Sequence, residues 1–171
     1  MELSKFEIPA AGRAGQWFEI VRLNGRFYAV SERELRGPEW KGAVPDGARL
    51  KLGSTHGEEY RLALQNEMVE AASDGMNRAG RRSARRGQAV ALPSAERQTE
   101  AQIGALAVHV LLDWEGITEG GAALPCTLEN RIKALGQIDF RDMVIEAADD
   151  LAAFAEAELG NSAGLPVSSS G

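Results

Sequence analysis

The pattern of apolar residues in the N-terminal third of the chain predicts a β-hairpin. Two β-favouring runs in QWFEIVRLNGRFYAV flank Asn24 and Gly25, a pair of residues that accepts the positive φ angles of a type I′ turn. The turn sequence Pro45–Gly47 precedes ARLKL, which is a candidate third strand. Closing the chain at Asn24–Gly25 predicts the pairs Leu23–Arg26, Val21–Tyr28 and Glu19–Val30.

The spacing of apolar residues becomes helical after these strands. Ser31 and Glu34 have the spacing of a capping box, which predicts a short helix that ends at Gly37–Pro38. Thr55 and Glu58 repeat that spacing before a longer helix. Gly75 and Gly80 weaken the end of this helix, so we expect it to fray into a linker. The apolar stripe of the longer helix consists of Tyr60, Leu64, Met68, Ala71 and Ala72.

A two-sided apolar pattern marks a third predicted helix, which begins near Gln98 and runs to Trp114. A helix with two apolar sides is either enclosed in the core or offers one side to a partner. The stripe expected to face the core contains Ile103, Leu106, Ala107, Val110, Leu111 and Trp114. The second side is therefore the candidate partner-binding surface, and it contains Ala101, Ala105, Val108 and Leu112.

Two more helices are predicted after a loop. Thr127 can cap the helix LENRIKAL. The last helix runs from Asp139 to about Leu159 and has an acidic side opposite its apolar stripe. We expect the last three helices to pack around Trp114, Leu128, Ile132, Phe140 and Leu151.

These elements predict an α+β fold, in which an N-terminal β-hairpin or small sheet is followed by a mainly α-helical region. A chain of 171 residues is long enough for one ordinary domain, or for one domain with a small appendage. The expected organisation is a hairpin-containing region over 1–53, a helix and the start of a basic linker over 54–86, a linker over 87–97, a helical region over 98–159 and a disordered tail over 160–171.

Charge and composition narrow the possible functions. The formal net charge of −6 argues against a general polyanion binder. Cys126 is the single cysteine, so the chain cannot form an internal disulfide, which fits a reducing compartment. The start MELSKFEIPAAG lacks the apolar core of a secretory signal, and no apolar stretch approaches the roughly 20 residues that span a bilayer. We therefore expect a cytoplasmic protein that does not bind membranes.

The sequence predicts no catalytic residue, cofactor or metal. A zinc site needs four ligands, whereas this chain offers one cysteine and two distant histidines, His56 and His109. No nucleophile elbow, Walker loop or dinucleotide-binding glycine motif occurs. We expect His109 to form a surface pair with Asp113, and Cys126 to be an inert thiol. The protein is therefore not expected to be an enzyme.

A basic segment leaves two interpretations open. Clustered arginines can contact phosphates, with an affinity that falls steeply as salt rises. No aromatic residue is interleaved with them to stack on bases, so a solvated linker is favoured over nucleic-acid binding. The cluster consists of Arg78, Arg81, Arg82, Arg85 and Arg86.

The last third of the chain has a distinctive order of motifs. An apolar stretch leads into DWEGI, a glycine-containing turn, LPCTLEN and IKAL, and a final amphipathic helix contains LAAF. Over Gln98 to Phe154 this order resembles the tail assembly chaperones of long-tailed bacteriophages, which carry a W-x-G-V/I motif before a turn, a proline-containing segment and two helices. Cys126 departs from that pattern, because the family has an aromatic or aliphatic residue there. The matching residues are Trp114, Gly116, Ile117, Leu124, Pro125, Glu129 and Asn130.

The resemblance implies a non-catalytic protein that coats the tape measure protein during tail assembly and recruits tail tube subunits. It also implies a structural role for Trp114, Gly116, Leu124 and Pro125, whose loop would anchor the third helix against the fourth. Apolar helix faces that cover another helix can also cause homo-oligomers. The alternatives are a virion structural or tail-completion protein that stays in the particle, and a small nucleic-acid-binding regulator that uses the arginines.

Overall fold

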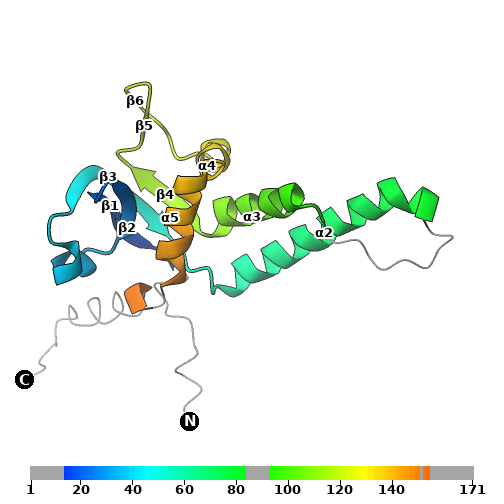
Figure 1. Cartoon of the computed structure of the whole chain (residues 1–171), viewed down its shortest axis with the longest axis horizontal. Helices are drawn as coiled ribbons and strands as arrows, with labels where there is room; N and C mark the ends of the chain where they lie inside the picture. Colours follow the sequence, from blue (N-terminus) through cyan, green and yellow to red (C-terminus); the bar gives the residue numbers. More distant parts are fainter. Residues whose placement is uncertain (1–13, 84–92, 151, 155–171) are drawn as a thin grey trace, which may run out of the picture.

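The computed structural model describes residues 14–83, 93–150 and 152–154, with side chains described up to residue 72 in the first long helix. An antiparallel sheet is followed by helices, which confirms the predicted α+β class (Figure 1). Two short 3₁₀ helices, η2 (Glu34–Arg36) and η3 (Pro38–Trp40), follow the second strand. The other elements are β1 (Gln16–Leu23), β2 (Arg26–Val30), β3 (Val44–Leu52), α2 (Glu58–Ser83), α3 (Ala95–His109), β4 (Leu111–Glu115), β5 (Thr118–Glu119), β6 (Ala122–Ala123), α4 (Leu128–Leu135) and α5 (Ile138–Asp149).

The β1–β2 hairpin forms as the sequence predicts. Asn24 and Gly25 have φ angles of 50° and 80°, as a type I′ turn requires. The predicted capping box at Ser31 also forms, because the Glu34 carboxylate accepts hydrogen bonds from the Ser31 backbone N–H and hydroxyl. The box closes the turn that leads into a 3₁₀ helix, where an α-helix was predicted. The strand pairs are the predicted ones, Leu23–Arg26, Val21–Tyr28 and Glu19–Val30.

The turn predicted at Pro45–Gly47 lies inside strand β3. Glu19 pairs with Arg49 and Val21 with Pro45, so β3 carries extra residues opposite β1. Gly47 has a φ angle of 81° within this bulge. The turn residues therefore bend a strand instead of ending it.

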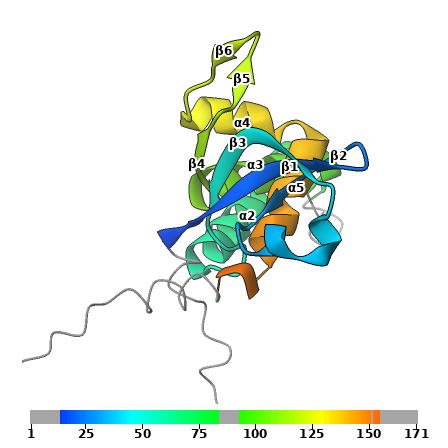
Figure 2. The same ribbon diagram turned by 90° about the vertical axis from the view of Figure 1, so that its left-hand side faces the viewer.

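One face of the sheet carries the core. The strand order is β2-β1-β3-β4, and in Figure 2 the sheet lies in front of helices α2, α3 and α5. Phe18, Leu50 and Trp114 lie in register on neighbouring strands and are buried on the helix side. On the other face, Arg49 lies over the Trp17 ring at 4.7 Å from its centre. Apolar residues therefore hold the sheet to the helices, and charged residues cover its other side.

Strand β4 corrects the prediction of a helix from Gln98 to Trp114. Helix α3 begins at Ala95 and ends at His109, and Leu111–Glu115 then pairs with β3. The backbone groups along this side of β3 need hydrogen-bond partners, and β4 supplies them. This tertiary pairing overrides the helical spacing of the apolar residues.

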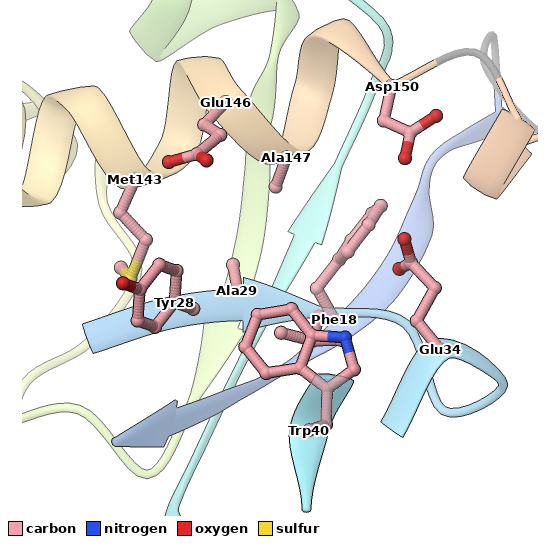
Figure 3. Close-up of a pocket in the computed structure, with 10 residues that line it drawn as sticks. Phe18, Tyr28, Ala29, Glu34, Trp40, Met143, Glu146, Ala147 and Asp150 are labelled. Atoms are coloured by element: carbon pink, nitrogen blue, oxygen red, sulfur yellow. The ribbon is translucent and has the colours of Figure 1, made fainter. Parts of the chain in front are cut away.

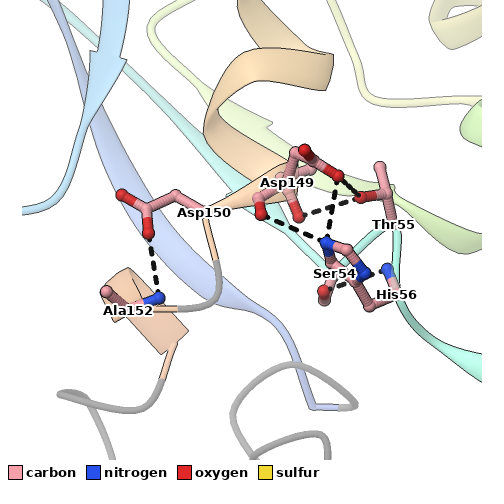
Figure 4. A network of polar contacts seen from close by, with 7 residues as sticks. Ser54, Thr55, His56, Asp149, Asp150 and Ala152 are labelled. Carbon is pink, nitrogen blue, oxygen red and sulfur yellow. Dashed lines mark hydrogen bonds and ion pairs between the residues drawn. The ribbon is translucent and has the colours of Figure 1, made fainter.

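Thr55 does not cap the first long helix. Its backbone N–H donates to the Ala148 carbonyl and its hydroxyl to the Asp149 carboxylate, at 3.0 and 2.8 Å. The imidazole of His56 lies 3.0 Å from the same carboxylate (Figure 4). These contacts fix the end of α5 to the start of α2, which then continues to Ser83 through both Gly75 and Gly80 instead of fraying.

Helices α4 and α5 also differ in part from the prediction. Thr127 caps α4 as predicted, since its hydroxyl accepts from the Asn130 N–H. Helix α5 ends at Asp149, and the Asp150 carboxylate caps the helical residues 152–154 by accepting from the Ala152 N–H at 2.9 Å, while residues 155–159 of the predicted helix lie outside the described part of the chain. The side chains of the arginine cluster, Leu151 and the predicted tail over 160–171 lie outside the described residues.

Candidate functional site

The tryptophan of the W-x-G motif closes a loop. Trp114 lies on β4 with 5% of its surface exposed, and its indole N–H donates to the Leu124 carbonyl at 2.7 Å. The Leu124 N–H in turn donates to the Ile117 carbonyl at 2.9 Å. A buried indole with a satisfied N–H contributes both apolar area and a fixed orientation. It therefore holds the base of the projecting β5–β6 hairpin.

The glycine of the motif is required by a close backbone approach. Gly116 has a φ angle of 75°, a conformation that costs little for glycine alone. A Cβ at this position would lie 2.5 Å from the Gly47 carbonyl oxygen and 2.9 Å from the Ala48 Cα. The end of β4 thus lies directly against the bulge in β3.

Pro125 connects this loop to α4. Its carbonyl accepts hydrogen bonds from the Asn130 side-chain amide and the Thr127 N–H, both at 2.9 Å. The four predicted motif residues are therefore brought together in one loop. They join strand β4 to α4, whereas the resemblance implied an anchor between two helices.

The candidate partner-binding residues do not form one exposed face. Ala101 and Ala105 are buried in the core. Leu112 is half-buried on β4, so it is not on the helix at all. Val108 is 49% exposed. Of the four residues, Val108 alone is a largely exposed apolar side chain.

Two apolar residues of α4 are also exposed. Leu128 and Ile132, which were expected in the core, are 48% and 44% exposed. Their spacing of four residues places them on one side of the helix. The Arg131 guanidinium ties α4 to the end of α3 by donating to the Ala107 carbonyl at 3.0 Å. We call Val108, Leu128 and Ile132 the α3–α4 apolar surface.

The spacing of Leu128 and Ile132 is visible in the sequence, but it does not reveal which way the side chains face. Leu135 continues the same apolar stripe and is completely buried. The direction of α4 is set by Arg131 and by the loop hydrogen bonds to Pro125, and neither could be predicted. The exposed part of the stripe was therefore mistaken for core.

His109 and Cys126 are titratable residues that the sequence singled out. Among the described residues, no group of three or more His, Cys, Asp or Glu side chains could hold a metal ion. His109 lies 4.0 Å from Glu59, and not beside Asp113 as predicted. Burial raises the pKa of the Cys126 thiol, and the positive charge of Arg131 opposes this shift. A raised pKa makes the reactive thiolate scarce at neutral pH.

The helices can be compared with the length and apolar character that a membrane-spanning helix needs. Within the part of the chain that the structure describes, no helix has the length and apolar character to cross a bilayer. The longest, α2, is 26 residues long and carries acidic residues in its first turn.

The protein has a small α+β fold. Its W-x-G loop is held by the hydrogen bond from Trp114 to Leu124, and Val108, Leu128 and Ile132 are exposed on α3 and α4. A comparison with protein families matches residues 64–164 to the YdaY prophage protein family. This match covers more than half of the chain, from within α2 past α5, so the chain belongs to that family. The protein is therefore phage-related. No curated protein and no solved structure matches it.

Proposed function

We propose that this protein is a non-enzymatic tail assembly chaperone, which binds the tape measure protein in the host cytoplasm and helps to recruit tail tube subunits. Membership of a prophage family supports a role in a phage. The order of motifs from Trp114 to the last helix supports the finer assignment. The observation that carries the proposal is the α3–α4 apolar surface, because a helix-binding protein needs exposed apolar residues beside a rigid support.

The size of this surface suits reversible binding. Complete burial of a Val, Leu or Ile side chain contributes roughly 1.5–3 kcal/mol. About half of each of the three side chains is already buried. Contact with an apolar helix would therefore contribute only a few kcal/mol per copy. Many copies along one long helix could keep it soluble and still leave when tube subunits arrive.

Co-expression with a tape measure fragment from the same prophage tests the proposal. Val108→Asp and Ile132→Asp place a carboxylate in the proposed contact, where it would lose its water. Both variants should keep native circular dichroism, yet leave the fragment insoluble and unbound. Leu62→Asp is the matched control, because Leu62 is 51% exposed on α2, outside this surface. The proposal fails if both variants bind and solubilise the fragment as the native chain does.

Mass spectrometry of purified virions separates this function from the structural alternative. A chaperone leaves as the tube assembles, so it should be absent from finished particles. A tail-completion protein would be present at a fixed number of copies per particle. Detection of the protein at such a fixed copy number would contradict the proposal.

A further inference from the structure

A second surface lies between α5 and the β1–β2 hairpin. Two neighbouring cavities share Met143 and Glu146, and we call them together the α5 groove. The wider cavity has a volume of about 660 Å³. Phe27, Phe140 and Met143 give it an apolar floor. Phe27 is 51% exposed, so a large aromatic side chain on this floor remains open to solvent.

The narrower cavity, of about 130 Å³, is lined by aromatic rings and carboxylates (Figure 3). Tyr28 and Trp40 meet edge to face, with ring centres 5.3 Å apart. Glu146 and Asp150 approach from α5, on the opposite side of the cavity. Aromatic faces and carboxylates both favour a cation. This cavity therefore suits one lysine or arginine side chain.

Negative charge predominates along the groove. Asp46, Asp139, Asp142 and Glu146 line the wider cavity, and among its described lining residues Arg26 alone is cationic. Arg26 lies over the ring of Tyr28, 5.9 Å from its centre. Within the described part of the chain, neither Asp142 nor Glu146 forms an ion pair. The rim therefore carries more negative charge than its own neighbours neutralise.

We propose that the α5 groove binds a basic amphipathic segment of a partner protein. Apolar side chains of that segment would cover Phe27, Phe140 and Met143, and a lysine or arginine would enter the narrower cavity beside Glu146. Charge complementarity favours this occupant, since opposite potentials guide partners together and fix their alignment. A second copy of the same acidic groove would be repelled. The inference goes beyond the chaperone function and does not depend on it.

Fluorescence anisotropy with a labelled model peptide tests the groove. The probe is an amphipathic helix of about 18 residues with leucine on one side and lysine on the other, long enough to span several turns. The full chain should bind it, and a matched peptide with glutamate in place of lysine should not bind. Binding should weaken as salt rises, because salt screens the rim charges.

Variants show where the probe binds. The double variant Asp142→Asn with Glu146→Gln should weaken binding at least about tenfold, and so should Phe27→Ser. Glu67→Gln with Glu70→Gln, on the exposed side of α2, removes the same charge and should change the affinity less than about twofold. Circular dichroism checks that each variant folds. Equal losses in the two double variants would show diffuse attraction to an acidic protein and overturn the proposal.

Two further results would also overturn it. If the native chain forms a dimer that the groove variants split in analytical ultracentrifugation, a second copy is the occupant. A variant that combines Arg81→Gln, Arg82→Gln, Arg85→Gln and Arg86→Gln tests the chain's own basic segment. If this variant binds the probe much more tightly than the native chain does, that segment is the occupant. The groove variants should still solubilise the tape measure fragment, so failure here is distinguishable from failure of the chaperone proposal.

Discussion

The W-x-G loop and the α3–α4 apolar surface come from the same stretch of chain. The loop buries its tryptophan, whereas the surface leaves its apolar side chains about half exposed. Trp114 is 5% exposed and its polar atom is satisfied by Leu124. Val108, Leu128 and Ile132 keep between 44% and 49% of their surface exposed. The loop therefore stabilises the fold, whereas the exposed residues add less stability and are the ones that we propose contact another molecule.

The difference follows from which groups form hydrogen bonds with the backbone in each region. In the loop, the chain passes close to the bulge in β3, and Gly116 makes this approach possible. The loop can then bury a large ring without leaving a polar group unsatisfied. Two hydrogen bonds hold α4 in place. The Arg131 guanidinium donates to the Ala107 carbonyl, and the Asn130 side-chain amide donates to the Pro125 carbonyl. Helix α4 is thus fixed without burying Leu128 and Ile132.

The largest expected effect is that of Trp114→Ala. Truncation of a buried tryptophan costs about 3–5 kcal/mol, a large part of the stability of a domain. If this region were helical, as its apolar spacing predicts, the hairpin would be less affected than the helices. Because β4 pairs with β3, we now expect the sheet and the helices to unfold together, measured as one thermal transition at a much lower temperature.

Trp17→Ala is the control for that variant, since Trp17 is only half-buried on the charged face of the sheet. It should lower the melting temperature much less. If both variants lowered the melting temperature equally, the buried Trp114 would stabilise the fold no more than the half-buried Trp17 does.

A smaller effect is expected from Gly116→Ala. The new methyl group would collide with the Gly47 carbonyl, and the positive φ angle adds strain of order 1–3 kcal/mol. Gly120→Ala has a similar φ angle of 59° but open space around it. Chemical denaturation should therefore show a larger loss at Gly116 than at Gly120. Equal losses would mean that the backbone angle matters and the close approach does not.

The smallest effect on stability belongs to Ile132→Ser on the α3–α4 apolar surface. About half of the Ile132 side chain is buried, so its removal should cost roughly 1 kcal/mol. Denaturation of this variant should therefore shift far less than that of Trp114→Ala. A loss as large as that of Trp114→Ala would place Ile132 in the core and end its role as a contact residue.

Local signals in the sequence were sufficient for the hairpin and for two caps. Asn24–Gly25, Ser31 with Glu34, and Thr127 each act within a few residues, and the structure confirms all three. Strand β4 could not be predicted, because its partner β3 lies about 60 residues away along the chain and the apolar spacing fitted a helix.

The candidate sites were less predictable than the fold. The sequence shows that the motif residues around Trp114 lie near one another along the chain, but their contact with the β3 bulge depends on a distant glycine. The α5 groove combines residues from β1, β2, β3, the two 3₁₀ helices, α5 and the loop after β4. No single stretch of sequence contains enough of them to form a recognisable pattern.

Site-specific photo-crosslinking during tail assembly tests the central claim most directly. A photoreactive amino acid at position 132, on the α3–α4 apolar surface, should crosslink to the tape measure protein before tails are complete. The same group at position 62 on α2, which is similarly exposed, should give little of that product. Crosslinking to the tape measure protein from position 62 and not from position 132 would contradict the account.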